Sequence, residues 1–302
     1  MQVSVIIVNY NTKKLTSECI DSVFEKTKDV EFEVILVDNA STDGSVEHFS
    51  NDKRITFIAS PENLGFGRAN NKGLEAATGK YIFYLNSDTL LANNAIKLFY
   101  DKFEESPEEI ACMGTMLWDK DGKVTHSFGR FPTVGISLLY KTPLFNIPTF
   151  LGILKGFDDE PKYIKGHFFP VPFITGADLF VRRSVIDKYG AFDKDFFMYF
   201  EDPDIQLRYY KHGYKSYIYD APHIHHLEGA SSKKKPNLWR RMTGLRSCYT
   251  YHKKHATRIG YFMLRLFLPL LSLPYLFQST FSWSDKLKYM KATFCMKIEI
   301  SS

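Results

Sequence analysis

The chain has 302 residues, with 39 Lys and Arg against 34 Asp and Glu, and its formal net charge is +5. Apolar residues make up 44% and charged residues 24%, a composition ordinary for a globular protein, which excludes a disordered or collagen-like chain. The four cysteines, Cys19, Cys112, Cys248 and Cys295, lie far apart, so the sequence predicts neither a disulfide scaffold nor a zinc knuckle. The opening MQVSVIIVNYN has no basic region before its apolar run and is not typical of a secretory signal, so we expect a cytoplasmic protein.

The charge is unevenly distributed along the chain. Residues 1–228 carry 25 Lys and Arg and 32 Asp and Glu, a balance of −7, whereas residues 229–284 carry ten Lys and Arg and no acid. Residues 285–302 add four basic and two acidic side chains. An acidic body therefore precedes a basic tail, and such a tail can meet nucleic acid, an anionic membrane or a phosphorylated ligand.

The basic run leads into an apolar and aromatic segment at residues 259–281. Arg265, Pro269 and Pro274 interrupt this segment, whereas a spanning helix needs about 20 clean apolar residues. A basic run before an aromatic, proline-broken segment is typical of an interfacial membrane anchor, which is the interpretation we favour. The alternative is a C-terminal helical hairpin that packs on the body.

Strand and helix alternate through the first part of the chain. The strands read as continuous apolar runs of the kind that a sheet buries on both faces, and the helices carry one apolar face. In chain order we expect a strand at 3–8, a helix at 15–24, a strand at 32–37, a short helix after 45, a strand at 55–58, a helix at 68–77, a strand at 81–85, a helix at 93–105 and a strand at 110–116. Alternation over short loops predicts an α/β fold with an open, mostly parallel Rossmann-like sheet and helices on both faces.

The alternation fails after about residue 117. Residues 131–173 are rich in Pro, Phe and Leu without a clear period, and we expect a long loop over the site. Regular elements return after it, with a strand at 179–181, helices at 183–189 and 202–212, and a strand at 216–219.

Polar residues follow the predicted parallel strands, and ligands of such sheets bind beyond the carboxyl ends of the strands. Asn9-Tyr10-Asn11 follows the first strand and Asp38 ends the second. A carboxylate at that place can accept a hydrogen bond from a ribose hydroxyl or a base N–H, although a lone Asp more often caps the next turn. Neither a GxGxxG fingerprint nor a Walker sequence is present, which disfavours a dinucleotide site of that kind.

Asn86-Ser87-Asp88 ends another strand and is a candidate metal site. Mg²⁺ or Mn²⁺ takes few protein carboxylates and completes its shell with phosphate oxygens, which suits a single Asp facing a cleft. The alternative, that Asp88 caps the following helix, carries equal weight. His223, His225 and His226 fall within four residues; a solvent-exposed cluster is the plain interpretation, but an imidazole beside a carboxylate would suit Mn²⁺.

Glu201, Asp202 and Asp204 open a predicted helix directly after the aromatic run FFMYF. Acids at a helix start can simply cap it and oppose its dipole. Neighbouring like charges and apolar walls, however, raise the pKa of a carboxyl group towards that of a useful general base. We therefore regard this segment as a candidate for the base.

Seven motifs occur in order along residues 1–255: VSVIIVNYN (3–11), VDNASTDGS (37–45), ENLGFGRANNKG (62–73), YLNSD (84–88), GADLFVRR (176–183), FFMYFEDPD (196–204) and HHLEGASS (225–232). Their ordered set resembles family 2 inverting glycosyltransferases of the A-type fold, and in particular the bacterial rhamnosyltransferase-like branch that builds cell-surface polysaccharides. The resemblance implies one catalytic domain at 1–230, with a nucleotide-sugar-binding half at 1–117 and an acceptor-binding half at 118–230. The charge and apolar pattern described above predicts a basic, apolar, helical, membrane-associating extension at 231–302.

The resemblance also implies a role for each matching residue. Nucleotide-sugar binding falls to Asn9, Tyr10, Asn11, Asp38, Asn63, Asn70, Asn86, Ser87 and Asp88. Asp88 and His226 would hold Mg²⁺ or Mn²⁺, with Asn86 in place of the first Asp of the family's Asp-x-Asp. Asp202 would be the base, with Glu201 beside it. The acceptor would meet Gly176, Ala177 and Asp178, the last standing where a small or apolar residue is expected; Arg246 of the basic tail is added because it can reach the acceptor's diphosphate.

The expected activity is transfer of one sugar from a nucleotide sugar, dTDP-rhamnose or a UDP-sugar, to a lipid-linked or growing cell-surface glycan. A processive synthase is disfavoured because the family's Gln-x-x-Arg-Trp motif is absent. We expect a peripheral protein on the inner face of the cell membrane, with an anionic membrane surface and no nucleic acid among its partners. The alternatives are a nucleotidyltransferase that makes nucleotide sugars, which would want a Gly-rich basic loop where this chain has Asn-Tyr-Asn, and an inert membrane-associated glycan-assembly protein.

Overall fold

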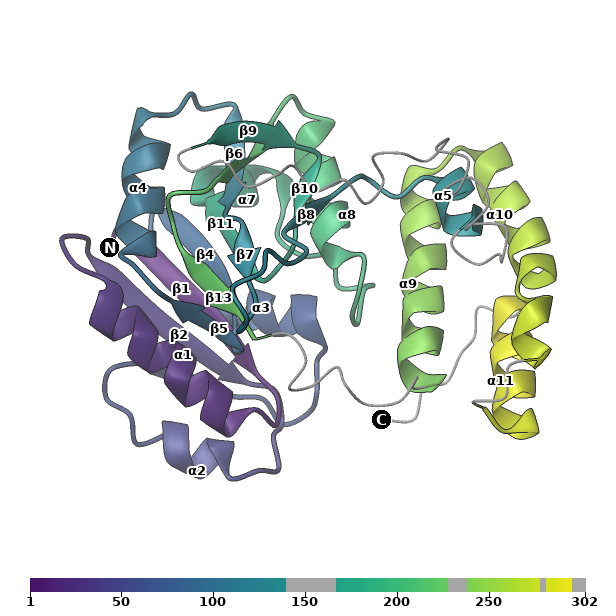
Figure 1. Cartoon of the computed structure of the whole chain (residues 1–302), viewed down its shortest axis with the longest axis horizontal. Helices are drawn as coiled ribbons and strands as arrows, with labels where there is room; N and C mark the ends of the chain where they lie inside the picture. Colours follow the sequence, from purple (N-terminus) through teal and green to yellow (C-terminus); the bar gives the residue numbers. More distant parts are fainter. Residues whose placement is uncertain (140–166, 228–237, 278–280, 295–302) are drawn as a thin grey trace. The chain divides into compact units, whose positions relative to one another are not determined.

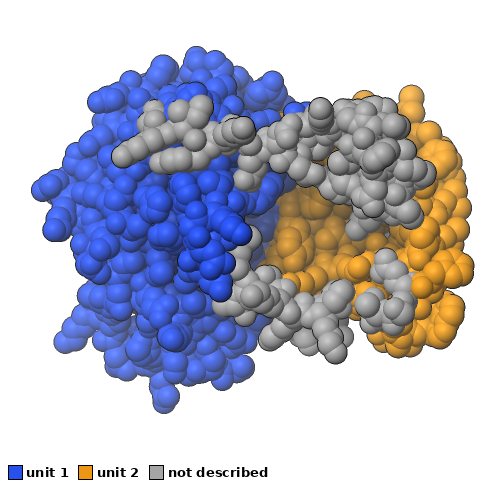
Figure 2. Space-filling model, viewed as in Figure 1, with its two compact units in different colours: residues 1–130, 161–194, 201–232 blue, residues 131–160, 195–200, 233–302 orange. Residues whose placement is uncertain are grey.

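A computed structural model describes residues 1–139, 167–227, 238–277 and 281–294 of the chain. The chain forms two compact units (Figure 2): unit 1 comprises residues 1–130, 161–194 and 201–232, and unit 2 comprises residues 131–160, 195–200 and 233–302. Unit 2 thus takes two segments from within the first 230 residues. The domain scheme drawn from the sequence remains a prediction.

Unit 1 is built on an eight-stranded sheet (Figure 1) with the strand order β3-β2-β1-β4-β11-β6-β12-β9. Its strands are β1 (Val3–Asn9), β2 (Phe32–Asp38), β3 (Thr56–Ala59), β4 (Tyr81–Asn86), β6 (Ile110–Gly114), β9 (Phe168–Val171), β11 (Asp178–Arg182) and β12 (Lys215–Tyr219). The four strands β3, β2, β1 and β4 are parallel, as are β6 and β12, while β11 runs antiparallel to both of its neighbours and β9 runs antiparallel to β12. The expected mostly parallel α/β sheet is confirmed.

Helices cover both faces of this sheet. They are α1 (Lys13–Lys26), α2 (Ser45–Phe49), α3 (Phe66–Leu74), α4 (Ala95–Glu105), α7 (Arg183–Tyr189) and α8 (Glu201–Tyr210). Apolar side chains of α1, α2 and α4 join one face of the sheet in one buried cluster, and those of α3, α7 and α8 join the other face in a second. Successive residues of β1, such as Val5 and Ile6, belong to the clusters on opposite faces of the sheet. Both faces of the strand are therefore buried, which explains its unbroken apolar run.

Two small sheets lie beside the main one. One has the order β5 (Thr89–Leu91), β13 (Ile224–His226) and β7 (Leu117–Trp118), and the other pairs β8 (Phe128–Gly129) with β10 (Phe173–Ile174). In the first of these, β13 runs antiparallel to β5 and places His226 opposite Thr89. The histidine strand is therefore fixed next to the loop that follows β4.

The expected long loop at 131–173 is wrong for the part that the structure describes. Residues 140–166 lie outside the described residues, but α5 (Val134–Leu139), β9 and β10 flank them. The sequence pattern was misleading because Pro170 stands inside β9. β9 is the last strand of the sheet and pairs only with β12, and an edge strand tolerates the missing N–H of a proline.

Unit 2 is helical in its described part. It contains α5, α9 (Leu238–His255), α10 (Arg258–Leu271), the 3₁₀ turn η2 (Leu273–Phe277) and α11 (Trp283–Phe294). Its core joins Leu245 and Tyr249 of α9 to Leu264 of α10 and Tyr289 of α11, and α5 packs against α10 (Figure 1). The lysines at 233–235, which open the basic run, lie outside the described residues.

Candidate active site

Asn9 ties the ends of the first two strands together. Its side chain donates to Asp38 Oδ2 (2.6 Å) and accepts from the Thr12 and Thr16 hydroxyls (2.9 and 2.8 Å). Asp38 Oδ1 accepts from the Ser41 backbone N–H (2.9 Å), so this Asp does cap its turn. Both side chains are fully buried. Their visible contacts hold the loops in shape, and contact with a nucleotide stays a prediction.

The other residues assigned to the nucleotide lie on these same loops. Tyr10 is about half exposed, at 48%, and Asn11 adopts the left-handed backbone (φ 55°) with its Oδ1 accepting from the Thr42 N–H (2.7 Å). Asn63 accepts from Asn39 Nδ2 (2.9 Å). Asn70 is buried on α3. Tyr10 is thus the member of this set that offers a broad ring surface to solvent.

The metal candidates Asp88 and His226 meet in unit 1. Asp88 Oδ1 lies 3.3 Å from His226 Nε2, and the two side chains are 16% and 7% exposed. The Leu227 N–H donates to the Asp88 carbonyl (2.8 Å), which fixes the histidine strand against the loop. Ser87 Oγ lies 3.2 Å from Thr12 Oγ1, and the Asn86 N–H donates to Ala177 O (3.0 Å).

This pair fits a hard divalent cation. Neighbouring ligands of an octahedral ion with bonds of 2.0–2.1 Å lie about 3 Å apart, close to the observed 3.3 Å. One carboxylate oxygen and one imidazole nitrogen form a donor set that suits Mn²⁺. Among the described residues there is no group of three or more His, Cys, Asp or Glu that could hold an ion. A cation on this pair would therefore need further ligands, such as diphosphate oxygens and water.

Asp202 carries the features of a general base. It lies in the first turn of α8, and its Oδ2 accepts from the Gly176 backbone N–H (2.9 Å). Its Oδ1 is buried and has no hydrogen-bond partner among the described residues. Burial raises the pKa of the Asp202 carboxyl to about 6, and the Gly176 N–H opposes the rise. One oxygen is thus anchored and the other is left for a proton.

The backbone around Asp202 is specialised on both sides. A Cβ at Gly176 would overlap Asp202 Oδ1, so only glycine lets the carboxylate approach this N–H. Tyr199 and Phe200, directly before α8 in the chain, both adopt the left-handed conformation with φ of 72° and 66°. Two consecutive left-handed residues with large side chains are strained, and such strain clusters at functional sites.

Three consecutive residues, of which the last begins β11, each hold a different part of the candidate site. Gly176 anchors Asp202, and Ala177 O accepts from the N–H of Asn86, which precedes the metal candidate Asp88 by two residues. Asp178 Oδ2 accepts from the Thr115 N–H (2.5 Å), while its Oδ1 is buried without a hydrogen-bond partner in the described part of the chain. Burial raises the pKa of the Asp178 carboxyl well above its ordinary range. Because Asp178 is fully buried, its visible role is structural, and acceptor contact stays a prediction.

Sequence reasoning missed Gln206 and Thr115. Gln206 is buried on α8, one turn after Asp202, and exchanges two hydrogen bonds with the backbone of Ile174 (2.9 and 2.7 Å). The Thr115 hydroxyl donates to Pro222 O (2.6 Å), which leads into β13. The spacing of four between Asp202 and Gln206 puts both on one face of the helix, and that was the available signal.

The two remaining residues of the predicted site lie on helices. Glu201 is buried at the start of α8. Arg246 is exposed on α9 in unit 2.

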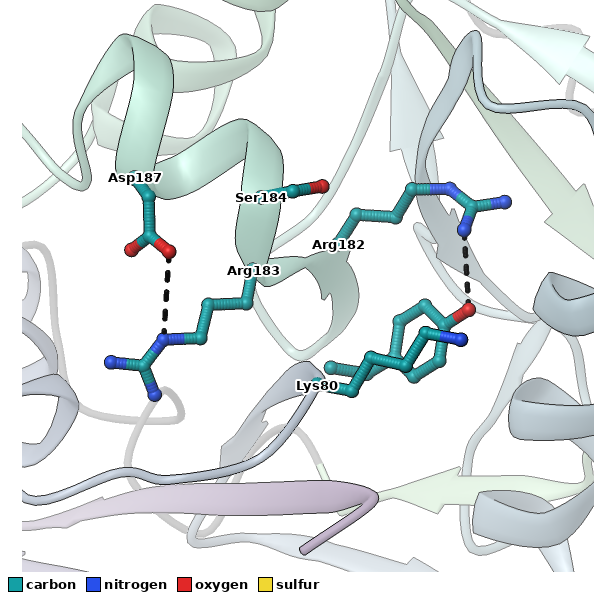
Figure 3. A pocket seen from close by; sticks show the side chains of 6 residues that line it. Lys80, Arg182, Arg183, Ser184 and Asp187 are labelled. Atoms are coloured by element: carbon teal, nitrogen blue, oxygen red, sulfur yellow. Dashed lines mark hydrogen bonds and ion pairs between the residues drawn. The ribbon is translucent and has the colours of Figure 1, made fainter.

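One basic cavity lies at the other end of the sheet (Figure 3). It measures about 280 Å³ and is lined by Lys80, Tyr81, Arg182, Arg183, Ser184 and Asp187. Tyr81 begins β4, whereas the candidate site follows its last residue, Asn86, roughly 16 Å along the strand. Arg183 pairs with Asp187 (3.7 Å) and Lys80 with Glu104 (2.6 Å). Lys80 and Arg183 thus form ion pairs within unit 1, and the cavity is not part of the candidate active site.

Comparison with solved structures identifies the class of fold. The structure of GalNAc-T7 with UDP, GalNAc and Mn²⁺ superimposes with a TM-score of 0.65 at 15% sequence identity, covering 98% of this chain and 55% of that chain. The α/β fold with its largely parallel sheet is thus the A-type glycosyltransferase fold. A likeness at this level of identity establishes the fold alone.

Comparison of sequences identifies the family. The model described as glycosyl transferase family 2 matches residues 4–190, more than half of the chain, and the chain belongs to this family. It is 28% identical over 244 residues to an uncharacterized glycosyltransferase, YfnE, of Bacillus subtilis, covering 70% of this chain and 61% of that protein. It is 28% identical over 211 residues to the N-acetylglucosaminyl-diphospho-decaprenol L-rhamnosyltransferase of Mycobacterium tuberculosis, covering 64% and 66%. The chain thus spans less than two thirds of the length of these relatives.

Proposed function

We propose that this chain is an inverting glycosyltransferase that moves one sugar from a nucleotide sugar to a lipid-linked or growing cell-surface glycan. The observation that carries the proposal is the buried carboxyl of Asp202, with one oxygen anchored by the Gly176 N–H and a pKa near 6. Such a group is mostly ionised at neutral pH and still basic enough to assist an attacking hydroxyl.

The reaction is a single displacement. The acceptor hydroxyl loses its proton to Asp202 while its oxygen forms a bond to the anomeric carbon. The bond from that carbon to the diphosphate oxygen breaks, and the nucleoside diphosphate leaves with the bonding electrons. Attack opposite to the leaving group inverts the configuration, and the carbon has oxocarbenium character, as in glycoside hydrolysis. No second carboxylate is needed as a nucleophile.

Asp88 and His226 would hold Mg²⁺ or Mn²⁺, with Asn86 and Ser87 on the same loop and Glu201 beside the base. The bound cation would neutralise the charge that develops on the diphosphate. The mycobacterial relative's name gives L-rhamnose as its sugar and a sugar-diphospho-polyprenol as its acceptor. We extend those classes to this chain: dTDP-rhamnose, or a UDP-sugar, as donor, and a polyprenyl-diphosphate glycan as acceptor.

The Asp202→Asn variant tests the base. Asn keeps an oxygen that can accept from the Gly176 N–H, so the variant should fold and bind donor, while transfer should fall roughly 100-fold or more. Transfer is measured as nucleoside diphosphate released in the presence of acceptor, and donor binding by calorimetry. Near wild-type transfer by Asp202→Asn would refute the assignment. Release of pyrophosphate from a nucleoside triphosphate would identify a nucleotidyltransferase instead.

The metal proposal has its own test. Chelation by EDTA should abolish transfer, and added Mn²⁺ or Mg²⁺ should restore it. Asp88→Ala should weaken metal-dependent nucleotide binding, measured with the nucleoside diphosphate and Mn²⁺ by calorimetry, while leaving metal-independent binding in place. Full transfer in EDTA would mean that cationic side chains neutralise the diphosphate without an ion.

A further inference from the structure

Unit 2 presents an apolar surface on α10 and η2. Every side chain between residues 259 and 277 that is exposed is apolar. The large ones range from 38% exposed, at Met263, to 85%, at Phe277. They are Ile259, Phe262, Met263, Leu266, Leu270, Leu273 and Phe277, and these seven residues make up the apolar surface. Five of the seven recur at helical spacing along one face of α10 and two follow on η2, which is more than the scattered exposed apolar residues of an ordinary protein surface.

The opposite face of α10 is committed to the core of unit 2. Leu264 and Leu268 are fully buried in the cluster that includes Tyr249 and Tyr289. Arg265 lies over the Tyr249 ring and donates to Phe294 O (3.0 Å). The segment Arg258–Phe277 is long and apolar enough to cross a membrane by length and composition alone, but only 28% of its most apolar window is buried. The helix is therefore neither a wholly buried core helix nor detached from its neighbours.

Positive charge predominates in the chain around the apolar surface, although α11 also carries one acid, Asp285, in its first turn. Residues 229–284 contain ten Lys and Arg and no acid. Arg258 is exposed at the start of α10. On α11 the exposed Lys288 and Lys291 stand among the exposed side chains of Trp283 and Leu287. Lysines beside tryptophan and leucine are typical of protein surfaces that bind the headgroup region of anionic lipids.

We propose that the apolar surface lies in the plane of an anionic lipid bilayer, inserted at the boundary between headgroups and acyl chains, with the α11 lysines among the headgroups. This inference rests on the proposed function, because a soluble donor and a lipid-linked acceptor would meet at that boundary. A spanning helix is disfavoured because it would strip Leu264 and Leu268 from their core and carry Arg265 into hydrocarbon. A second copy of the chain is disfavoured as the occupant because the two copies would bring together segments that each carry an excess of positive charge.

The test uses the full-length chain and sedimentation with vesicles of equal parts phosphatidylcholine and phosphatidylglycerol, without donor or acceptor. The triple variant Phe262→Ser, Leu266→Ser and Leu270→Ser should lower vesicle binding by roughly 10-fold or more. The matched control Val46→Ser with Tyr210→Ser removes exposed apolar side chains from unit 1 and should bind as the wild type does. The charge variant Lys288→Glu with Lys291→Glu should lose binding at low salt and show a weaker salt dependence.

Depth is measured separately through tryptophan fluorescence. Vesicle binding should shift the emission of Trp283 to the blue, and the shift should be lost in Trp283→Phe. Bromine carried high on the acyl chains should quench this emission more strongly than bromine at the bilayer centre, because the surface lies in the plane.

Three outcomes would overturn the proposal: no wild-type binding to the anionic vesicles, equal binding by the triple variant, or a lipid-free dimer in sedimentation equilibrium that the triple variant abolishes. Stronger quenching from the bilayer centre would refute the in-plane arrangement. Because sugar transfer is not the readout, a failure here leaves the proposed activity standing, and a failure of transfer leaves vesicle binding standing.

Discussion

At the scale of single residues, the pKa of Asp202 sets the pH dependence of the proposed reaction. Burial raises this pKa from its ordinary 3.8 to about 6, so the carboxyl is protonated, and unable to act as a base, below that pH. We expect kcat/KM to rise about 10-fold per pH unit up to pH 6 and then to level off. The residual activity of Asp202→Asn should lack this acidic limb. An unchanged limb in the variant would assign the titration to another group.

The raised pKa of Asp202 also affects stability: activity should rise with pH, whereas the contribution of this carboxyl to the free energy of unfolding should fall. The folded chain binds more protons at Asp202 than the unfolded chain between about pH 4 and pH 6. The contribution of this carboxyl to the free energy of unfolding therefore falls as pH rises through that window. Urea unfolding of the wild type and of Asp202→Asn should converge near pH 4, and at pH 7 the variant should be the more stable of the two.

Gly176 makes the anchoring of Asp202 testable without touching the carboxylate. A Cβ at this position would overlap Asp202 Oδ1, so Gly176→Ala must displace the Asp202 carboxylate. A displacement of about 1 Å can cost roughly 100-fold in rate, and we expect a fall in transfer of that order with donor binding retained. Gly135→Ala is the matched control, because a Cβ there meets nothing within 4 Å and the residue lies on the helix α5. Equal activity of the two variants would contradict the anchoring role.

Residue-scale prediction from sequence was possible where a motif fixes a place along the chain. The motifs put Asp88 and His226, 138 positions apart, into one hypothesis, and the structure brings them within 3.3 Å. Their role in holding a metal stays a prediction. The hydrogen-bond partner of each polar atom could not be predicted from the sequence. Asn9 and Asp38 lie where expected, but their hydrogen bonds are to each other and to the neighbouring loop. A hydrogen-bond partner from a distant loop leaves no local pattern.

At the scale of elements, the residues at and just before the start of β11 link the proposed metal loop to the proposed base. Asp178 begins that strand and accepts a hydrogen bond from the Thr115 N–H just after β6, and burial raises the pKa of its carboxyl well above the ordinary range, which favours the neutral form. Asp178→Asn should therefore be nearly neutral, because the amide supplies the same acceptor oxygen. Asp178→Leu should destabilise the fold by about 1–3 kcal/mol, since it leaves the Thr115 N–H without its acceptor.

These two variants are compared by thermal unfolding and by transfer. If Asp178→Asn lost as much stability as Asp178→Leu, the carboxyl would have to be ionised in the folded chain. Because its pKa is raised, the contribution of Asp178 to unfolding free energy falls as pH rises, and Asp178→Asn should remove that part of the pH dependence.

The elements of unit 1 were largely predictable because buried parallel strands leave unbroken apolar runs. The strand expected at 32–37 is β2, and the helix expected at 183–189 is α7. The sequence does not predict β9, because Pro170 usually ends a strand. The proline is tolerated since β9 lies at the edge of the sheet, and that position depends on the tertiary structure. β11 was expected as a strand, but its antiparallel direction follows from pairing and not from composition.

At the scale of the whole molecule, the sequence presented the C-terminal segment as either an anchor or a packed hairpin. α10 has one face in the core of unit 2 and one apolar face exposed, so it packs on the neighbouring helices of unit 2, while anchoring stays a prediction. Deleting residues 259–302 is consequently a poor test of anchoring. It would uncover Leu245 and Tyr249 on α9, and exposed core would obscure any change in membrane binding. Substitutions on the exposed face avoid this difficulty.

The last prediction follows from the proposal that catalysis and membrane binding involve different units. The proposed base and metal ligands belong to unit 1, whereas the apolar surface belongs to unit 2. The triple variant Phe262→Ser, Leu266→Ser and Leu270→Ser should therefore keep wild-type kcat/KM with a water-soluble acceptor analogue. With a polyprenyl-diphosphate acceptor embedded in anionic vesicles, kcat/KM should fall by about the factor by which vesicle binding falls, since binding to the surface concentrates the enzyme near its acceptor. Equal losses with both acceptors would mean that the substitutions damage the fold, and equal retention would mean that transfer does not depend on adhesion to the bilayer.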